Sequence, residues 1–278
     1  MGSNLERFFF QMGARVKQVE VAPEPMGWRR VNSRGEDLPV VLDIKRDNRG
    51  SFFEVRTLIG TRQELLVLNA EPRKKHLLLL SRQFDSAGRV VAKQKFLCGH
   101  EERHWFVAAI PEDEPVSTVA GAQTALKPTE VRLREETLGI KREQGFRRRN
   151  AAFIRQGEWF FVPAKGVAPD PLRLLRNEPL SRGNGSKAHW AELCYRSGGE
   201  TVYVSAKYPG GLSVDDYKAL PEQERKFGFR MMKRDAAVYV KGEITHPDHK
   251  TVFLEGWHRV FMNTENRSMA MRFLAFLD

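Results

Sequence analysis

Five of the chain's seven histidines fall in two short stretches, and imidazole both binds metal ions and transfers protons near neutral pH. His246 and His249 enclose Pro247 and Asp248, which suit the centre of a type I turn. The outer residues of such a turn lie within about 7 Å of one another at Cα, so both imidazoles can reach one ion or one substrate group. His258 follows on the next expected strand. We therefore predict a catalytic centre formed by His246, Asp248, His249 and His258.

Two kinds of chemistry fit this centre. Three nitrogen or oxygen ligands with one open position are typical of a catalytic zinc site, in which a divalent ion activates water for hydrolysis. The same side chains can instead act as general acids and bases. The alternative is structural: a surface hairpin turn that carries two histidines, with His258 a packed residue that shares its strand face with Val260 and Met262 and has one satisfied nitrogen.

The second stretch contains Cys98, His100 and His104, in the order Cys-x-His-x-x-x-His. Thiolate and imidazole are the ligands that zinc prefers, so these three residues are a candidate metal site whose fourth ligand could come from Cys194 or His189. The alternative is a polar loop between two strands, with Cys98 buried as a small apolar residue.

Basic residues cluster at three places, and guanidinium and ammonium groups bind phosphate. One cluster follows Phe146, one flanks the glycine-rich residues 183–186, and one occupies an expected turn. Exposed aromatic rings beside such cations can stack on bases. The alternative is that these basic residues are only solvated charges on turns and on a linker. The predicted nucleic-acid contacts are Arg73, Lys74, Lys75, Arg147, Arg148, Arg149, Arg182 and Lys187.

The overall charge favours a polyanionic partner. Forty-six Lys and Arg against 35 Asp and Glu give a net charge of +11, and the pI is about 9.8, which is typical of nucleic-acid-binding proteins. We expect an intracellular protein that binds RNA or DNA through backbone phosphate. The alternatives are a hydrolase or nuclease that uses a divalent metal such as zinc, and a structural subunit that binds an acidic protein.

Several classes of protein are disfavoured. Two cysteines, Cys98 and Cys194, do not make the disulfide framework of a small secreted domain. The first residues lack the pattern of a signal peptide, and no apolar run approaches the roughly 20 residues that cross a bilayer. We therefore expect a cytoplasmic location and no membrane partner. The glycine fingerprints of Rossmann enzymes and the nucleophile elbow of α/β-hydrolases are missing.

Alternating apolar residues between Gly, Pro and Asn breaks predict an α+β fold, rich in antiparallel strands and barrel- or sandwich-like, with a few short helices. Residues 1–38 are expected to be irregular. We predict an N-terminal strand-rich domain over 1–128, a basic linker over 129–150 and a C-terminal α+β domain over 151–278. Helices are expected at 117–126 and 213–220, and 188–195 suits either a helix or a strand. Strands are expected at 40–44, 51–58, 64–69, 75–83, 90–97, 104–110, 158–163, 200–207, 236–245, 250–263 and 269–276.

Overall fold

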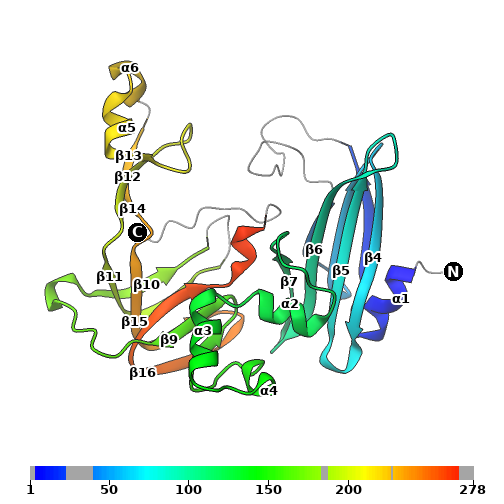
Figure 1. The fold of residues 1–278 in the computed structure, drawn as a ribbon, viewed down its shortest axis with the longest axis horizontal. Coiled ribbons are helices and arrows are strands. Elements are labelled where there is room, and N and C mark those ends of the chain that lie inside the picture. The colour runs from blue at the N-terminus through cyan, green and yellow to red at the C-terminus, as the bar shows by residue number, and fades with distance from the viewer. Residues whose placement is uncertain (1–3, 23–39, 183–186, 227, 269–278) are drawn as a thin grey trace. The chain divides into compact units, whose positions relative to one another are not determined.

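A computed structural model describes residues 4–22, 40–182, 187–226 and 228–268 (Figure 1). The chain divides into two compact units, Met1–Arg132 with Asn263–Arg272, and Leu133–Met262 with Phe273–Asp278. Among the described strands every pair is antiparallel except β1 with β3. The predicted strand-rich α+β class with mainly antiparallel sheets is confirmed.

The first unit contains two sheets. One has the strand order β1-β3-β2 and the other β4-β5-β6-β7. The second sheet is a meander, as expected for strands separated by short Gly- and Pro-containing turns. The strands are β1 (Val16–Val21), β2 (Val40–Asp47), β3 (Gly50–Leu58), β4 (Arg62–Glu71), β5 (His76–Phe84), β6 (Val90–Glu101) and β7 (His104–Ile110).

Apolar side chains from both sheets form one core, which includes Leu42 and Phe53 from the first sheet and Leu79 and Phe96 from the second. Buried and more exposed residues alternate along most of β3, because one face of the strand packs into this sandwich core. A separate cluster covers the other face of the meander, where α2 (Val119–Ala125) packs on Leu78, Leu97, Ala108 and Ile110. Thr118 caps α2 by accepting a hydrogen bond from the Gly121 amide.

The N-terminal segment differs from its prediction as irregular. Residues Asn4–Gln11 form α1, and β1 runs parallel to β3. Leu5 and Phe9 lie one turn apart on the buried face of α1, whereas Phe10 is 80% exposed. The triplet of phenylalanines hid this period, because three adjacent apolar residues point in three directions around a helix.

The second unit is built on a six-stranded sheet of order β10-β11-β15-β16-β9-β8. One of its faces carries a core that includes Trp159, Phe161, Val240 and Leu254. The segment 188–195, which suited a helix or a strand, belongs to a strand. The strands are β8 (Ile154–Gln156), β9 (Trp159–Pro163), β10 (Leu175–Leu180), β11 (His189–Ser197), β15 (Ala237–His246) and β16 (His249–Met262).

The connection between β11 and β15 forms a small subdomain with its own sheet of order β13-β12-β14. Ser213 begins its first helix as predicted, because its hydroxyl accepts from the Asp216 amide. The elements are β12 (Glu200–Val204), β13 (Leu212–Ser213), α5 (Val214–Ala219), α6 (Glu222–Arg225) and β14 (Arg230–Arg234).

The stretch 129–150, predicted as a basic linker, contains α3 (Thr129–Thr137) and α4 (Arg142–Gly145). Three 3-10 turns complete the described elements: Pro72–Lys74, Pro171–Arg173 and Thr264–Arg267. The strand expected at 269–276 lies outside the described residues. Among the helices described, none combines the length and the apolar character needed to cross a membrane.

Two neighbouring phenylalanines on α1 give a matched test of the first core. Phe9 is fully buried, and its ring centroid lies 4.9 Å from that of Phe53. We expect Phe9→Ala to cost about 3–5 kcal/mol of unfolding free energy, and Phe10→Ala less than about 0.5 kcal/mol. Hydrogen exchange of the β3 and β5 amides measures both values within this unit. Equal effects of the two substitutions would contradict this account of α1.

Candidate metal centre

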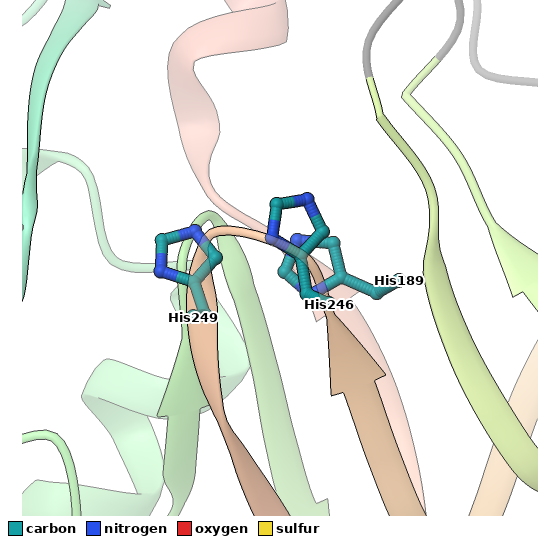
Figure 2. Close-up of side chains that lie close together, drawn as sticks. All are labelled: His189, His246 and His249. Carbon is teal, nitrogen blue, oxygen red and sulfur yellow. The ribbon is translucent and has the colours of Figure 1, made fainter.

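Three histidines of the second unit meet at one end of the six-stranded sheet (Figure 2). His189 begins β11, while His246 and His249 end β15 and begin β16. One ring nitrogen from each lies within 4.8 Å of those of the other two, and in the described part of the chain this is the only group of three or more potential metal-ligating side chains.

The turn that carries His246 and His249 forms because Pro247 and Asp248 suit its two central positions, as the sequence indicated. His246 and His249 pair directly across the hairpin, so Pro247 and Asp248 are its two central residues. Asp248 does not have a positive φ, which suits type I geometry rather than the mirror-image turns. The two imidazole centroids are 4.7 Å apart as a result.

Gln156 sets the orientation and the proton position of His189. Its side-chain Nε2 donates to the carbonyl oxygens of Ile244 at 3.1 Å and Lys250 at 2.7 Å. Because both amide protons are used, Oε1 faces Nδ1 of His189, at 2.9 Å, and must accept. Nδ1 of His189 therefore carries a proton, and in the neutral ring the lone pair is on Nε2. A hydrogen bond of this kind to a ligating histidine is a regular feature of metal sites.

His246 is less prepared to bind an ion. Its Nδ1 accepts a hydrogen bond of 3.0 Å from the Asp248 amide. Binding of an ion must therefore either replace this hydrogen bond or move the ring proton away from Nε2. Burial, followed by the charges of His189 and His249, lowers the pKa of His246 to about 4. The ring is therefore neutral at pH 7, as a metal ligand has to be.

Glu158 adds a carboxylate to the cluster. One of its oxygens lies 3.7 Å from Nε2 of His189, and the other lies 3.8 Å from Nε of Arg182. Burial acts to raise the pKa of Glu158, but the hydrogen bond and charge of His189 and the charge of Arg182 outweigh it and lower the pKa to about 2. Glu158 is therefore ionised at neutral pH. Glu158 therefore places a negative charge beside Nε2 of His189.

The turn between β8 and β9 leaves room for the rings because it contains a glycine. Gly157 has a φ of +57°, and a Cβ built on it would lie 2.9 Å from Nε2 of His249 and 3.2 Å from Cε1 of His189. Both the backbone conformation and the space therefore favour glycine at this position.

The donor set fits a divalent ion of the zinc type. Zinc–nitrogen bonds of about 2.0–2.1 Å place tetrahedral ligand nitrogens about 3.4 Å apart. The ring nitrogens here lie up to 4.8 Å apart, so side-chain rotations that move each nitrogen by about an ångström would bring them to the spacing of zinc ligands. Three protein ligands leave one position open, as in catalytic zinc sites.

The fourth residue of the predicted centre, His258, does not join the group. It lies far along β16, where it pairs with Val240 and Pro163. It is 8% exposed, and its Nδ1 is 2.8 Å from the Gly256 carbonyl. Burial lowers its pKa. These features match the alternative interpretation of His258 as a packed residue with one satisfied nitrogen.

The predicted site of Cys98, His100 and His104 does not gather in the first unit. Cys98 is fully buried in the sandwich core, and burial raises the pKa of its thiol. His100 shares the face of Cys98 and packs on Trp105 at 4.8 Å between ring centroids. His104 on β7 pairs with Glu101 on β6. Glu101 follows His100 directly and therefore points to the opposite face of the sheet, so His104 faces that side as well.

The three predicted basic clusters lie in different surroundings. Arg73 and Lys74 occupy the 3-10 turn before β5 in the first unit, and Lys75 ends it. The segment 147–149 follows α4 in the second unit, where the backbone of Arg149 pairs with that of Ile154 in an isolated antiparallel β-bridge. Arg182 and Lys187 border the histidine cluster, and the residues 183–186 between them lie outside the described part. The predicted nucleic-acid contacts at Arg147, Arg148 and these other positions remain predictions.

Three residues of the cluster were missed from the sequence: His189, Gln156 and Glu158. His189 was considered as a neighbour of the glycine-rich loop and as a possible fourth ligand of the site at Cys98, His100 and His104, and not as a partner of His246 and His249. Gln156 and Glu158 flank a glycine between two apolar runs, which indicates a hairpin turn and gives no sign of a ligand. Only the pairing of distant strands reveals that these residues meet.

A matched pair of glycines tests the cluster's shape. Gly157→Ala and Gly166→Ala both place an alanine at positive φ, but only the first Cβ meets the histidines, whereas nothing lies within 4 Å of the second. We expect both variants to fold and Gly157→Ala alone to weaken zinc binding, because its methyl group displaces His249. Titration calorimetry measures this, and equal zinc affinities would contradict the geometry.

The role of Gln156 can be tested in the same assay. Leucine keeps the volume of Gln156 but cannot accept the Nδ1–H of His189, so we expect Gln156→Leu to weaken zinc binding by about 10–100-fold. Gln63 is a suitable control, because it is a strand glutamine in the other unit. An affinity unchanged in Gln156→Leu would show that this hydrogen bond does not position the ring.

Compared with protein-family models, with curated proteins and with solved structures, the sequence shows no significant match. A fold alone does not indicate an activity. The function is therefore argued from the site.

Proposed function

We propose that the protein is a metal-dependent hydrolase whose centre is formed by His189, His246 and His249. The observation that carries this proposal is the gathering of three imidazoles, one of which has its tautomer set by Gln156. Gln156 leaves Nε2 of His189 as the lone-pair nitrogen, and the ring of His189 stacks on that of His246 with centroids 4.2 Å apart. Small side-chain rotations from this arrangement would bring the ring nitrogens around one ion.

A divalent ion bound there supplies Lewis acidity and lowers the pKa of a coordinated water to about 7. The chain's own groups do the rest. Glu158 is ionised and borders the cluster, so it can orient the attacking water and accept its proton. Gln156 keeps His189 directed at the ion, and Asp248 holds the turn beside it.

The experiment has two parts, and the first is elemental analysis of protein purified without chelators. We expect about one zinc, manganese or iron ion per chain, and loss of that ion in His189→Ala. His104→Ala is the control, because His104 is exposed in the other unit. No bound metal, or equal metal in both variants, would refute the proposal.

The second part measures hydrolysis of p-nitrophenyl esters by the metal-loaded protein. Glu158→Gln keeps the size of the side chain and removes its basicity, so we expect metal content to persist while the hydrolysis rate falls by about 10²–10⁴-fold. Glu255→Gln on β16 is the matched control, because Glu255 is exposed and lies outside the cluster. An undiminished rate in Glu158→Gln would exclude it as the base.

A further inference from the structure

Two cations border the histidine cluster, each separated from it by one carboxylate. Lys187 Nζ lies 2.8 and 2.7 Å from the two carboxylate oxygens of Asp248, the turn residue between two of the histidines. Arg182 Nε lies 3.8 Å from Glu158, whose other oxygen faces His189. These cations come just after β10 and just before β11, at the end of this strand pair where Leu180 pairs with His189.

From this arrangement we propose that the substrate is a phosphodiester, which Arg182 and Lys187 bind by its phosphate oxygens. This inference rests on the proposed hydrolase function. It also gives the predicted phosphate contacts at Arg182 and Lys187 a specific place, at the reacting bond rather than along a remote surface.

The charges match this substrate class. The two cations Arg182 and Lys187 face the two carboxylates Glu158 and Asp248 one for one, and a divalent ion would add positive charge to this balanced set. A phosphodiester carries one negative charge, and attack at phosphorus places further negative charge on its oxygens. Fixed cations beside those oxygens stabilise the charge as it develops, which is a large source of catalysis. A neutral ester has no charge in its ground state for these cations to bind.

Lys187 is able to turn toward a substrate. Its side chain is 61% exposed, and an ion pair this exposed contributes little to stability, so exchanging one anion for another costs little. Arg182 lies beside the carboxylate of Glu158, 3.8 Å from Nε to the nearer oxygen. A guanidinium can bind two phosphate oxygens at once, which lysine cannot do.

The reaction balances with the groups present. The oxygen of water forms a bond to phosphorus while Glu158 accepts the proton. The P–O bond to one alcohol breaks, its electron pair leaves with that oxygen, and solvent protonates it. The products are one phosphate monoester and one alcohol. No oxidant or other co-reactant is needed.

The test compares three p-nitrophenyl substrates with the zinc-loaded protein: bis(p-nitrophenyl) phosphate, p-nitrophenyl phosphate and p-nitrophenyl acetate. We expect the diester to give the highest kcat/KM, and Arg182→Ala and Lys187→Ala each to lower that value by about tenfold or more. Zinc content should not change in either variant, and kcat/KM should fall more for the diester than for the acetate, which carries no charge for these cations to bind. Lys233→Ala is the control, because Lys233 lies on β14, away from the cluster.

The outcomes separate the two proposals. Cleavage of the acetate alone, or diester cleavage that neither variant affects, would overturn the phosphodiester inference and leave the hydrolase in place. A protein without metal or activity would overturn the hydrolase itself. A single-stranded oligonucleotide, tested as DNA and as RNA, identifies the source of the diester. Its cleavage supports a nucleic-acid substrate, and cleavage of bis(p-nitrophenyl) phosphate alone supports a small phosphodiester.

Discussion

The candidate site depends on the side chain of Gln156, which is 1% exposed and hydrogen-bonds three separate strands. It belongs to β8, donates to the carbonyls of Ile244 on β15 and Lys250 on β16, and accepts from His189 on β11. A buried amide must satisfy its donors and its acceptor, because each unmade hydrogen bond costs about 1–3 kcal/mol. The position of His189 is therefore fixed by the same bonds that hold two strands at the hairpin end.

This constraint explains why the site lies on turns and yet is well defined. The turn at Gly157 and Glu158 and the turn at Pro247 and Asp248 are both tight, and tight turns have few conformations. Gln156 joins them by bonding to the strand residues next to the second turn. Loops on a rigid scaffold are common places for binding groups, and here a buried hydrogen bond supplies the rigidity between the loops.

The parts of the site that the sequence predicted are those determined by local geometry. His246 and His249 were paired correctly because a Pro-Asp turn brings its two ends together whatever the rest of the chain does. His258 was assigned to the same centre because it is close in sequence, but a strand rises about 3.3 Å per residue and carries it away. His189 could not be assigned, because the pairing of β11 with β15 depends on the whole sheet. The same reasoning applies to the fold: the meander β4 to β7 followed from its turns, whereas the parallel pairing of β1 with β3 required distant contacts.

The net charge of the chain is a weaker guide to function than the arrangement of individual charges. Several cations predicted to contact nucleic acid have carboxylate neighbours: Lys74 lies 2.6 Å from Glu71, and Lys187 lies 2.7 Å from Asp248. Such pairs reduce the field that a distant polyanion experiences, since two opposite charges cancel at distances much larger than their separation. At short range the effect is different, because a phosphate can displace an exposed carboxylate from its lysine. The ion pair between Lys187 and Asp248 therefore weakens long-range attraction of a polyanion and still allows a phosphate to bind at contact distance, as the proposed substrate would.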